Sequence, residues 1–516
     1  MRMSRRQDHS SLLDDMPLQF NVLDLSALNE AEIKSMKNED AAKGMLQRWL
    51  SIRSVVSTSS SNAIRQQEAV FNSYLQAFRS IGKGFCGQVY EKLGTNRVYK
   101  RELNPGPQML WNDYKWHTCI YGAIFSGNFE NEEKAIDNLP MIRIPQVYAF
   151  ITQDSQDWWK QNEEKFSNIA PRAMTCLLET ERIQTLPKVV RQAIITVYCP
   201  EKQDKVKILQ DPENQNCLAR IYLGVRRQTR SQSEKFSLQN FELDLQILDD
   251  LELEKEHYAR EMARSLAIMH WKCQVSCEPV LVSRSLRDLC SNTFPKSQVD
   301  ADDVEFVLGS APTDLKLTSQ EIMLLPPNTA TETALNFKKR AVHMWLLDFN
   351  NCSEITMDES GVEKAEAAFW RNDPYYPRPV PPNHRDESLW KVFESSYLEQ
   401  SKLSANDTIK SQQLPQKFIN LVNKTARHRF KQQRELSSSG SDGPPRNAPF
   451  STGGSPTAGS PSRNSPFSGS LPARSPFSSP PSSGSLRRGH RQKKSREYPG
   501  FFSGSGSGSG SGGVGQ

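Results

Sequence analysis

A glycine-rich stretch near residue 80 has the residue types needed to hold a phosphate group. It reads Gly82-x-Gly84-x-x-Gly87-x-Val89 and is followed by Lys100. Glycine lets a backbone approach phosphates closely, because no Cβ stands in the way. β-Branched and aromatic residues follow the glycines, so we expect a strand there, whereas a dinucleotide-binding loop is followed by a helix. A strand, a loop and a strand with a later lysine are typical of protein kinases; a purely structural hairpin is the alternative.

Two acidic segments follow in an order that is also typical of kinases. The segment DADDVEFVL places Asp300 five residues before Glu305, and WLLDFN places Asp348 after an apolar run. In kinases the corresponding residues are the catalytic base, a metal-binding Asn and an Asp that holds Mg²⁺. The pattern therefore predicts Asp300 as the catalytic base. It predicts Asp348 and Glu305 as metal ligands, since carboxylate oxygen suits the hard cation Mg²⁺.

Two further segments would complete a nucleotide site. The segment CLLETERI would be the hinge strand whose backbone meets an adenine, and its Glu179 and Glu181 are candidate cofactor contacts. A helix is expected near 107–125, and its Asp113 is a candidate partner for Lys100. The expected cofactors are therefore ATP and Mg²⁺.

Several features of a kinase are changed or missing. No His-Arg pair precedes Asp300, Glu305 replaces Asn, and Asn350 replaces the Gly of Asp-Phe-Gly. Asp348 also follows Glu305 by 43 positions, more than a kinase normally has there. We therefore expect a nucleotide-binding pseudokinase that acts as a binding or scaffold module. An active ATP-dependent phosphotransferase, and a nuclear interaction protein without a nucleotide site, are the alternatives.

The surrounding segments predict an α+β fold. We expect a protein-kinase-like two-lobe domain over 80–424, with a small β-rich N-lobe (80–185) and a mainly helical C-lobe (186–424). Two amphipathic helices are expected in an N-terminal extension, 28–79. Their apolar faces hold Met45, Leu46, Trp49 and Leu50 in the first helix and Val70, Phe71, Tyr74, Leu75 and Phe78 in the second. Other strands are predicted at 144–151, 173–183, 304–309 and 343–349, and helices at 258–271, 360–371 and 386–424.

The composition separates a folded body from unfolded ends. Hydrophobic residues make up 36% of the chain, which is low for a fully globular protein. Residues 436–516 are rich in Ser, Pro and Gly and cannot bury enough apolar surface to fold, so we expect disorder there and in the polar segment 1–27. The tail holds nine Lys/Arg and two Asp/Glu, a net charge of +7; since the whole chain carries +6, residues 1–435 carry −1. We therefore expect no direct reading of nucleic acid by the body.

The basic tail is where an acidic partner would bind. Ser-Pro pairs begin at Ser455, Ser460, Ser465, Ser475 and Ser479. Phosphates on these serines would overturn the positive charge of the tail. The basic run RRGHRQKKSR (487–496) is a candidate ligand for a nuclear import receptor, so we expect a location in the nucleus, the cytoplasm or both.

The cysteines and the apolar runs exclude other classes of protein. The nine cysteines are scattered singly, which fits reduced thiols in an intracellular protein better than a disulfide framework. No stretch approaches the ~18 apolar residues of a membrane helix, so no membrane association is expected. No paired Cys-x-x-Cys spacing is present, so we expect no zinc.

Six segments together resemble one known family. They are ARIYLGVRR (219–227), FSLQNFEL (236–243), AIMHWKC (267–273), DADDVEFVLGS (300–310), WLLDFNNC (345–352) and NDPYYPRP (372–379). They are similar to the fungal domain-of-unknown-function 3669 family, which is often labelled "zinc finger protein", and the resemblance covers roughly 80–390. It implies a fungal protein, but no established activity and no site residues.

One segment interrupts this resemblance. Removal of the 24 residues 275–298 joins the flanks as HWKCQVDADDVEFVLG, which matches the family pattern without a gap. Its first two residues can be encoded as a 5′ splice site and its last as a 3′ splice end. We therefore predict that 275–298 is a translated intron; a genuine surface insertion is the alternative.

Overall fold

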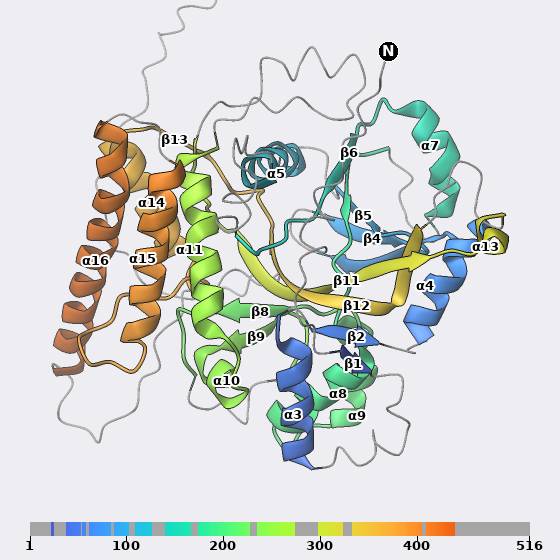
Figure 1. Cartoon of the computed structure of the whole chain (residues 1–516), viewed down its shortest axis with the longest axis horizontal. Coiled ribbons are helices and arrows are strands. Elements are labelled where there is room, and N and C mark those ends of the chain that lie inside the picture. Colours follow the sequence, from blue (N-terminus) through green and yellow to red (C-terminus); the bar gives the residue numbers. More distant parts are fainter. Residues whose placement is uncertain are drawn as a thin grey trace, which may run out of the picture. The chain divides into compact units, whose positions relative to one another are not determined.

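The structure is a computed structural model (Figure 1). It describes residues 22–24, 38–52, 54–57, 61–83, 87–102, 109–125, 140–166, 174–227, 235–273, 298–323, 333–404 and 409–438. All of them belong to one compact unit, Met1–Ala458. Gly84, most of the segment 275–298, and the tail with its run 487–496 lie outside the described residues. No helix among the described residues is long and apolar enough to cross a membrane.

A five-stranded antiparallel sheet contains the glycine-rich segment. Its strand order is β3-β4-β5-β7-β6. The strands are β3 (Phe78–Lys83), β4 (Gln88–Lys92), β5 (Arg97–Arg101), β6 (Val147–Ile151) and β7 (Leu177–Glu181). Gly94 has a φ of +73° in the turn between β4 and β5, a conformation that favours glycine. The predicted strands of this segment and the turn at Gly94 are confirmed.

Aromatic and aliphatic side chains cover the two faces of this sheet. On one face Tyr90 and Tyr99 pack against Trp159 of α7 (Gln156–Asn162). On the other face Tyr114 of α5 (Met109–Phe125) packs against Leu178. Alternation along the strands therefore gives the sheet two separate apolar layers.

A six-stranded sheet follows, with the order β1-β2-β12-β11-β8-β9. Its strands are β1 (Val22–Asp24), β2 (Val55–Ser57), β8 (Ala219–Tyr222), β9 (Phe241–Asp244), β11 (Glu305–Lys316) and β12 (Thr333–Leu347). A separate pair is formed by β10 (Gln298–Val299) and β13 (Glu354–Ile355). The second half of the chain is thus more β-rich than predicted, because β11 and β12 form one long hairpin. That hairpin accounts for the long spacing from Glu305 to Asp348. β1 lies in the N-terminal segment for which the sequence predicts no fold.

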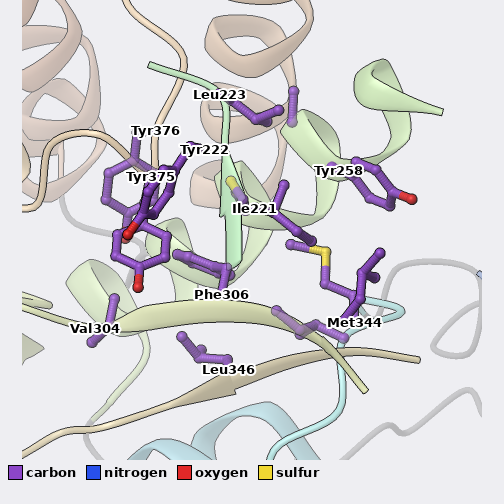
Figure 2. Packing of buried hydrophobic residues seen from close by; sticks show 14 of the residues in the cluster. Ile221, Tyr222, Leu223, Tyr258, Val304, Phe306, Met344, Leu346, Tyr375 and Tyr376 are labelled. Atoms are coloured by element: carbon purple, nitrogen blue, oxygen red, sulfur yellow. The ribbon is translucent and has the colours of Figure 1, made fainter. Parts of the chain in front are cut away.

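The main hydrophobic core lies between this sheet and the helices. Phe306 of β11 and Met344 and Leu346 of β12 are fully buried, and they meet Ile221 of β8 and Tyr258 of α11 in one cluster (Figure 2). Side chains at alternate strand positions share a face, so these strands present a continuous apolar surface to the helices.

The helices α11, α15 and α16 lie side by side against this core (Figure 1). The α-helices described from residue 188 onward are α8 (Lys188–Tyr198), α9 (Lys205–Gln210), α10 (Leu245–Asp250), α11 (Lys255–Trp271), α13 (Ser319–Met323), α14 (Glu359–Arg371), α15 (Glu387–Ser404) and α16 (Ile409–Ser438). The predicted helices at 258–271 and 360–371 are confirmed. The predicted helical segment 386–424 corresponds to α15 and α16.

The two predicted N-terminal helices have different outcomes. The helix α3 (Glu39–Leu50) buries the predicted apolar face, and α4 (Ser61–Phe71) begins where expected. The prediction that Tyr74 and Phe78 continue the face of α4 is wrong: Tyr74 is 97% exposed, and Phe78 begins β3. The chain leaves the helix at Asn72, whose φ of −133° is extended and whose side chain caps a short 3₁₀ turn.

The helix α4 connects the two sheets through two adjacent glutamines. Gln66 is buried; its Nε2 donates to Glu91 of β4 (2.9 Å), and its Oε1 accepts from the N–H of Gly94 (2.8 Å). Gln67 donates to the carbonyl of Leu335 and accepts from the N–H of Phe337, both in β12. The N-terminal extension is therefore built into the fold.

The described residues that flank 274–297 give a first prediction. Cys273 and Gln298 are both buried, and β10 packs against α11. Deletion of 275–298 puts Gln274 directly before Val299, where Gln298 stands. Because a long loop adds entropy to the unfolded chain, we expect the shortened protein to fold with an equal or higher melting temperature. Thermal unfolding of both proteins measures this.

The matched control for this deletion removes one residue more. Deletion of 274–298 leaves no glutamine before Val299, so the buried position of Gln298 in β10 is lost. This variant should be less stable than the first. Sequencing of the messenger RNA tests the intron itself: a major transcript that retains these bases would contradict it.

A buried histidine gives a second prediction. His270 of α11 is fully buried, and its Nδ1 lies 2.9 Å from the hydroxyl of Tyr397. Burial lowers the pKa of His270 to about 3, although the backbone of Asp300 acts in the opposite direction. In the folded chain the imidazole of His270 stays neutral down to a low pH, whereas in the unfolded chain it binds a proton near pH 6.5. The contribution of this residue is therefore complete above that pH and is lost as the pH falls toward 3.

We expect His270→Asn to flatten this pH dependence. Urea unfolding between pH 6.5 and 4 should show a slope about 1.4 kcal/mol per pH unit smaller than in the unsubstituted protein, which corresponds to one proton. The control is His428→Asn, which removes an exposed histidine of α16. Equal slopes in all three proteins would contradict a neutral, buried His270.

Candidate functional site

Lys100 lies between two carboxylates that come from distant parts of the chain. Its Nζ is 2.8 Å from Oδ2 of Asp113 and 3.1 Å from Oδ1 of Asp348. Asp113 is only 5% exposed, whereas the side chains of Lys100 and Asp348 are 22% and 31% exposed. The sequence made Asp113 a candidate partner for Lys100, and the structure places the two side chains in contact; it also brings Asp348 to the same lysine. One partner is thus buried, and the other two groups remain open to solvent.

The register of the five-stranded sheet positions Lys100. Lys100 of β5 is directly opposite Val89 of β4 and Leu178 of β7. Residues opposite each other in antiparallel strands share a face. Leu178 lies under α5, so the side chain of Lys100 points to the same side as that helix. Asp113 meets it there from the first half of α5.

The same helix is fixed to the segment that follows β12. Oδ1 of Asp113 accepts a hydrogen bond from the N–H of Phe349 (3.2 Å). The neighbouring Asn112 donates through Nδ2 to the carbonyl of Asn350 (2.6 Å). The ring of Phe349 is fully buried, with its centroid 4.9 Å from that of His117 of α5. These contacts hold Asp348 next to Lys100.

The backbone of the acidic segments is unusual. Asp348 has a φ of +65°, and Asp303 and Ala301 have values of +60° and +56°. Non-glycine residues rarely adopt this left-handed region, and such strain is often found at functional sites. The three residues belong to the two segments that the sequence singled out.

Glu305 forms an ion pair with Arg220 of β8. The two side chains are 2.7 Å apart, from Oε1 to Nη2. Burial raises the pKa of Glu305 to about 7; Arg220 opposes this shift, and the negative charges of Asp348 and Asp303 reinforce it. Glu305 thus belongs to the electrostatic surroundings of Asp348, and its role as a metal ligand stays a prediction. Arg220 was not among the predicted residues, and no local pattern in the sequence indicates it.

Asp303 is an additional acidic residue of this site. It is exposed, and Asn351 donates to its Oδ2 (2.6 Å). Loss of hydration raises the pKa of Asp303, Asn351 lowers it, and the negative charge of Asp348 raises it further. The sequence prediction chose Asp300 from the same acidic run, because only the spacing to Glu305 was used.

Asp300 makes its contacts inside the protein. Its side chain is 1% exposed and accepts hydrogen bonds from the N–H (2.8 Å) and the hydroxyl (2.5 Å) of Ser353. The N–H of Asp302 also donates to it, and Lys364 lies 3.8 Å away. Burial raises the pKa of Asp300, and the hydrogen bonds from Ser353 oppose that shift. Its role as a catalytic base stays a prediction.

The described glycines of the loop have different surroundings. A Cβ at Gly87 would lie 2.3 Å from the carbonyl oxygen of Arg101, so the close approach of the chains requires glycine there. A Cβ at Gly82 would meet nothing within 4 Å. Gly82 pairs with Val89, which pairs with Lys100, so these three residues form one row across the sheet. The open space beside the Cα of Gly82 therefore lies in the same row of the sheet as Lys100.

Glu179 and Glu181 lie on the other face of the sheet. Tyr99, opposite Glu179, donates its hydroxyl to that carboxylate (2.8 Å), and Arg97 also donates to it (2.5 Å). Glu181 accepts from Arg143 (3.3 Å). The structure therefore brings neither side chain to Lys100, because alternate strand residues point to opposite faces. Their role as nucleotide contacts stays a prediction that could involve only their backbone.

The residues around Lys100 fit a phosphate group and a magnesium ion. The ammonium group of Lys100 can bind phosphate oxygens as a point charge. Asp348 and Glu305 supply carboxylate oxygens, and Mg²⁺ commonly takes one or two carboxylates together with phosphates and water. Burial is the main cause of the raised pKa of Glu305, and the negative charges of Asp348 and Asp303 add to it, so a cation beside these acids would be favoured.

The described residues do not supply a zinc site. Within the described ranges, no group of three or more His, Cys, Asp or Glu side chains could hold a metal ion. A structural zinc site needs four such ligands. The described cysteines are free thiols at Cys119, Cys176, Cys199, Cys217, Cys273 and Cys352.

The comparisons with known proteins concern the segment that contains Asp348. No curated protein and no solved structure matches the chain. One family does match, and the matched segment begins in β12 and ends after α15. Over residues 344–408, the chain matches the domain-of-unknown-function 3669 family, described as "Zinc finger protein", which is the family that its motifs resemble.

Proposed function

We propose that this protein is a kinase-like two-lobe domain that binds a nucleotide together with Mg²⁺. In this proposal Lys100 binds the phosphates, and Asp348 and Glu305 hold the metal. The glycines at 82 and 87 let the loop approach the nucleotide closely. The biological role is that of a binding or scaffold module.

One observation carries the proposal. Lys100 contacts Asp113 of a helix and Asp348 of a strand end, at 2.8 and 3.1 Å. In kinases the strand lysine pairs with an acid of the following helix, and both this pair and the metal-binding aspartate must be in place. An ordinary surface ion pair joins two side chains, whereas this contact links the strand β5, the helix α5 and the end of the strand β12.

The order of elements gives further support. The glycine-rich segment separates β3 from β4, Lys100 lies on the next strand, and an acidic residue of the following helix meets it. The strand β7 then lies beside β5, and Asp348 follows a later strand. This is the order of the kinase signature segments. The long β11–β12 hairpin and the N-terminal extension are additions to that plan.

The roles of the residues follow from their chemistry. A bound Mg²⁺ would neutralise part of the charge of the phosphates. Lys100 adds a second positive charge, and Asp113 keeps that side chain in place from its buried side. Asp348 and Glu305 offer hard oxygen donors beside the lysine.

The surroundings of Asp300 favour binding over phosphate transfer. A general base must come within hydrogen-bond reach of the proton that it accepts. Asp300 is buried, and its carboxylate already accepts two hydrogen bonds from Ser353. An active phosphotransferase is the second candidate function. Its base would be the exposed Asp303, which lies close enough to Asp348 for their charges to interact.

Ligand-induced stabilisation tests the proposal. ATP with excess Mg²⁺, at 100 times its dissociation constant, should stabilise the full-length protein by ~2.7 kcal/mol. Lys100→Ala should remove most of this stabilisation, because the phosphates lose their cation. Each protein is compared with its own ligand-free form by thermal unfolding, so a lower intrinsic stability of the variant does not matter.

Two further variants complete this experiment. Lys160→Ala removes an exposed lysine of α7 and should leave the stabilisation by ATP unchanged. Asp348→Asn should remove the part that depends on Mg²⁺. If ATP with Mg²⁺ does not stabilise the unsubstituted protein, nucleotide binding is wrong, and a purely protein-binding role is favoured.

A further inference from the structure

Glu305 stands where a kinase has a neutral asparagine, and a positive charge accompanies it. Nη2 of Arg220 lies 2.7 Å from Oε1 of Glu305. The side chains are 20% and 17% exposed, so water screens the pair only in part. When Glu305 is ionised, Glu305 and Arg220 together carry no net charge, as a single asparagine would.

Arg220 is held in place by its own strand. It belongs to β8, which pairs with β11 on one side and β9 on the other. Arg220 is opposite Val307, two residues after Glu305 in β11. The hydroxyl of Tyr222, two residues later in β8, interacts electrostatically with the guanidinium, and the Tyr222 ring packs edge-on against Tyr375 at 5.0 Å between centroids. The guanidinium therefore has little freedom to leave Glu305.

We propose that Arg220 is a positioning residue that allows a glutamate to replace the metal-binding asparagine. It binds one oxygen of Glu305, fixes the carboxylate and cancels its charge. The other oxygen of Glu305 would then be available to the magnesium ion. The pair would add no negative charge that repels the nucleotide phosphates. This inference rests on the proposed function and deepens it.

The charge argument predicts opposite changes for two ligands. Without Arg220, the site gains one negative charge that a bare cation favours and an anionic nucleotide complex opposes. Arg220→Met should therefore strengthen the binding of Mn²⁺ alone by about fivefold to tenfold. It should weaken the binding of Mg²⁺–ATP by a similar factor. A merely structural role of Arg220 would weaken both.

Electron paramagnetic resonance measures free Mn²⁺, and a fluorescent ATP analogue with Mg²⁺ measures nucleotide binding. The double variant Arg220→Met/Glu305→Gln has the same net charge as the unsubstituted protein. It should bind both ligands within about threefold of that protein, because an amide oxygen replaces one carboxylate oxygen as the donor. Arg220→Lys should likewise keep both affinities, because the positive charge remains.

The control cuts an ion pair away from the site. Arg385→Met separates Arg385 from Asp249 of α10 and should change neither affinity. If Arg220→Met does not fold, Glu305→Gln is compared with the double variant. The second change removes an unpaired positive charge and should then strengthen the binding of Mn²⁺.

The outcomes separate the two proposals. If the unsubstituted protein binds neither ligand, the proposed function is wrong, and the inference falls with it. If it binds both, but Arg220→Met weakens both and the double variant restores neither, only the role of Arg220 is wrong. Opposite changes with restoration in the double variant would establish that role.

Discussion

One ammonium group shared by two carboxylates is the interaction on which the site depends. Lys100, Asp113 and Asp348 come from a strand, a helix and the end of a second sheet, and Lys100 and Asp348 are 248 positions apart. A partly buried charge that loses its partner is costly, so none of the three can move alone without a penalty. Asp113 also accepts the N–H of Phe349. The contact therefore fixes the relation of the first sheet, its helix and the second sheet at one point.

The helix α4 of the N-terminal extension supports this arrangement through a second set of contacts. The adjacent glutamines of α4, Gln66 and Gln67, use their amide groups on different sheets. An amide both donates and accepts, so each glutamine satisfies a donor and an acceptor of its sheet. The ion pair at Lys100 and the helix α4 thus hold the two sheets through independent interactions.

The sequence predicted the parts of the site that have a local signature. Gly82, Lys100 and Asp348 lie in segments whose glycine spacing or apolar neighbours indicate strands and turns. In the structure, Lys100 and Asp348 are in contact. Arg220 could not be found in this way, because it meets Glu305 only through the pairing of β8 with β11. The long hairpin was also missed, since its distal part has little apolar periodicity. Local patterns locate elements, whereas partners across a sheet depend on tertiary pairing.

The register of the β11–β12 hairpin determines which changes in length the protein can tolerate. Glu305 is opposite Leu347, the residue before Asp348, so both acids lie at the same end of the hairpin. A shift of one residue there would turn Glu305 to the other face of the sheet. The irregularity after Pro312 interrupts the ladder farther along, between this end and the tip. Related chains could therefore gain or lose residues beyond that point during evolution, while the open end of the hairpin keeps its acidic residues in register.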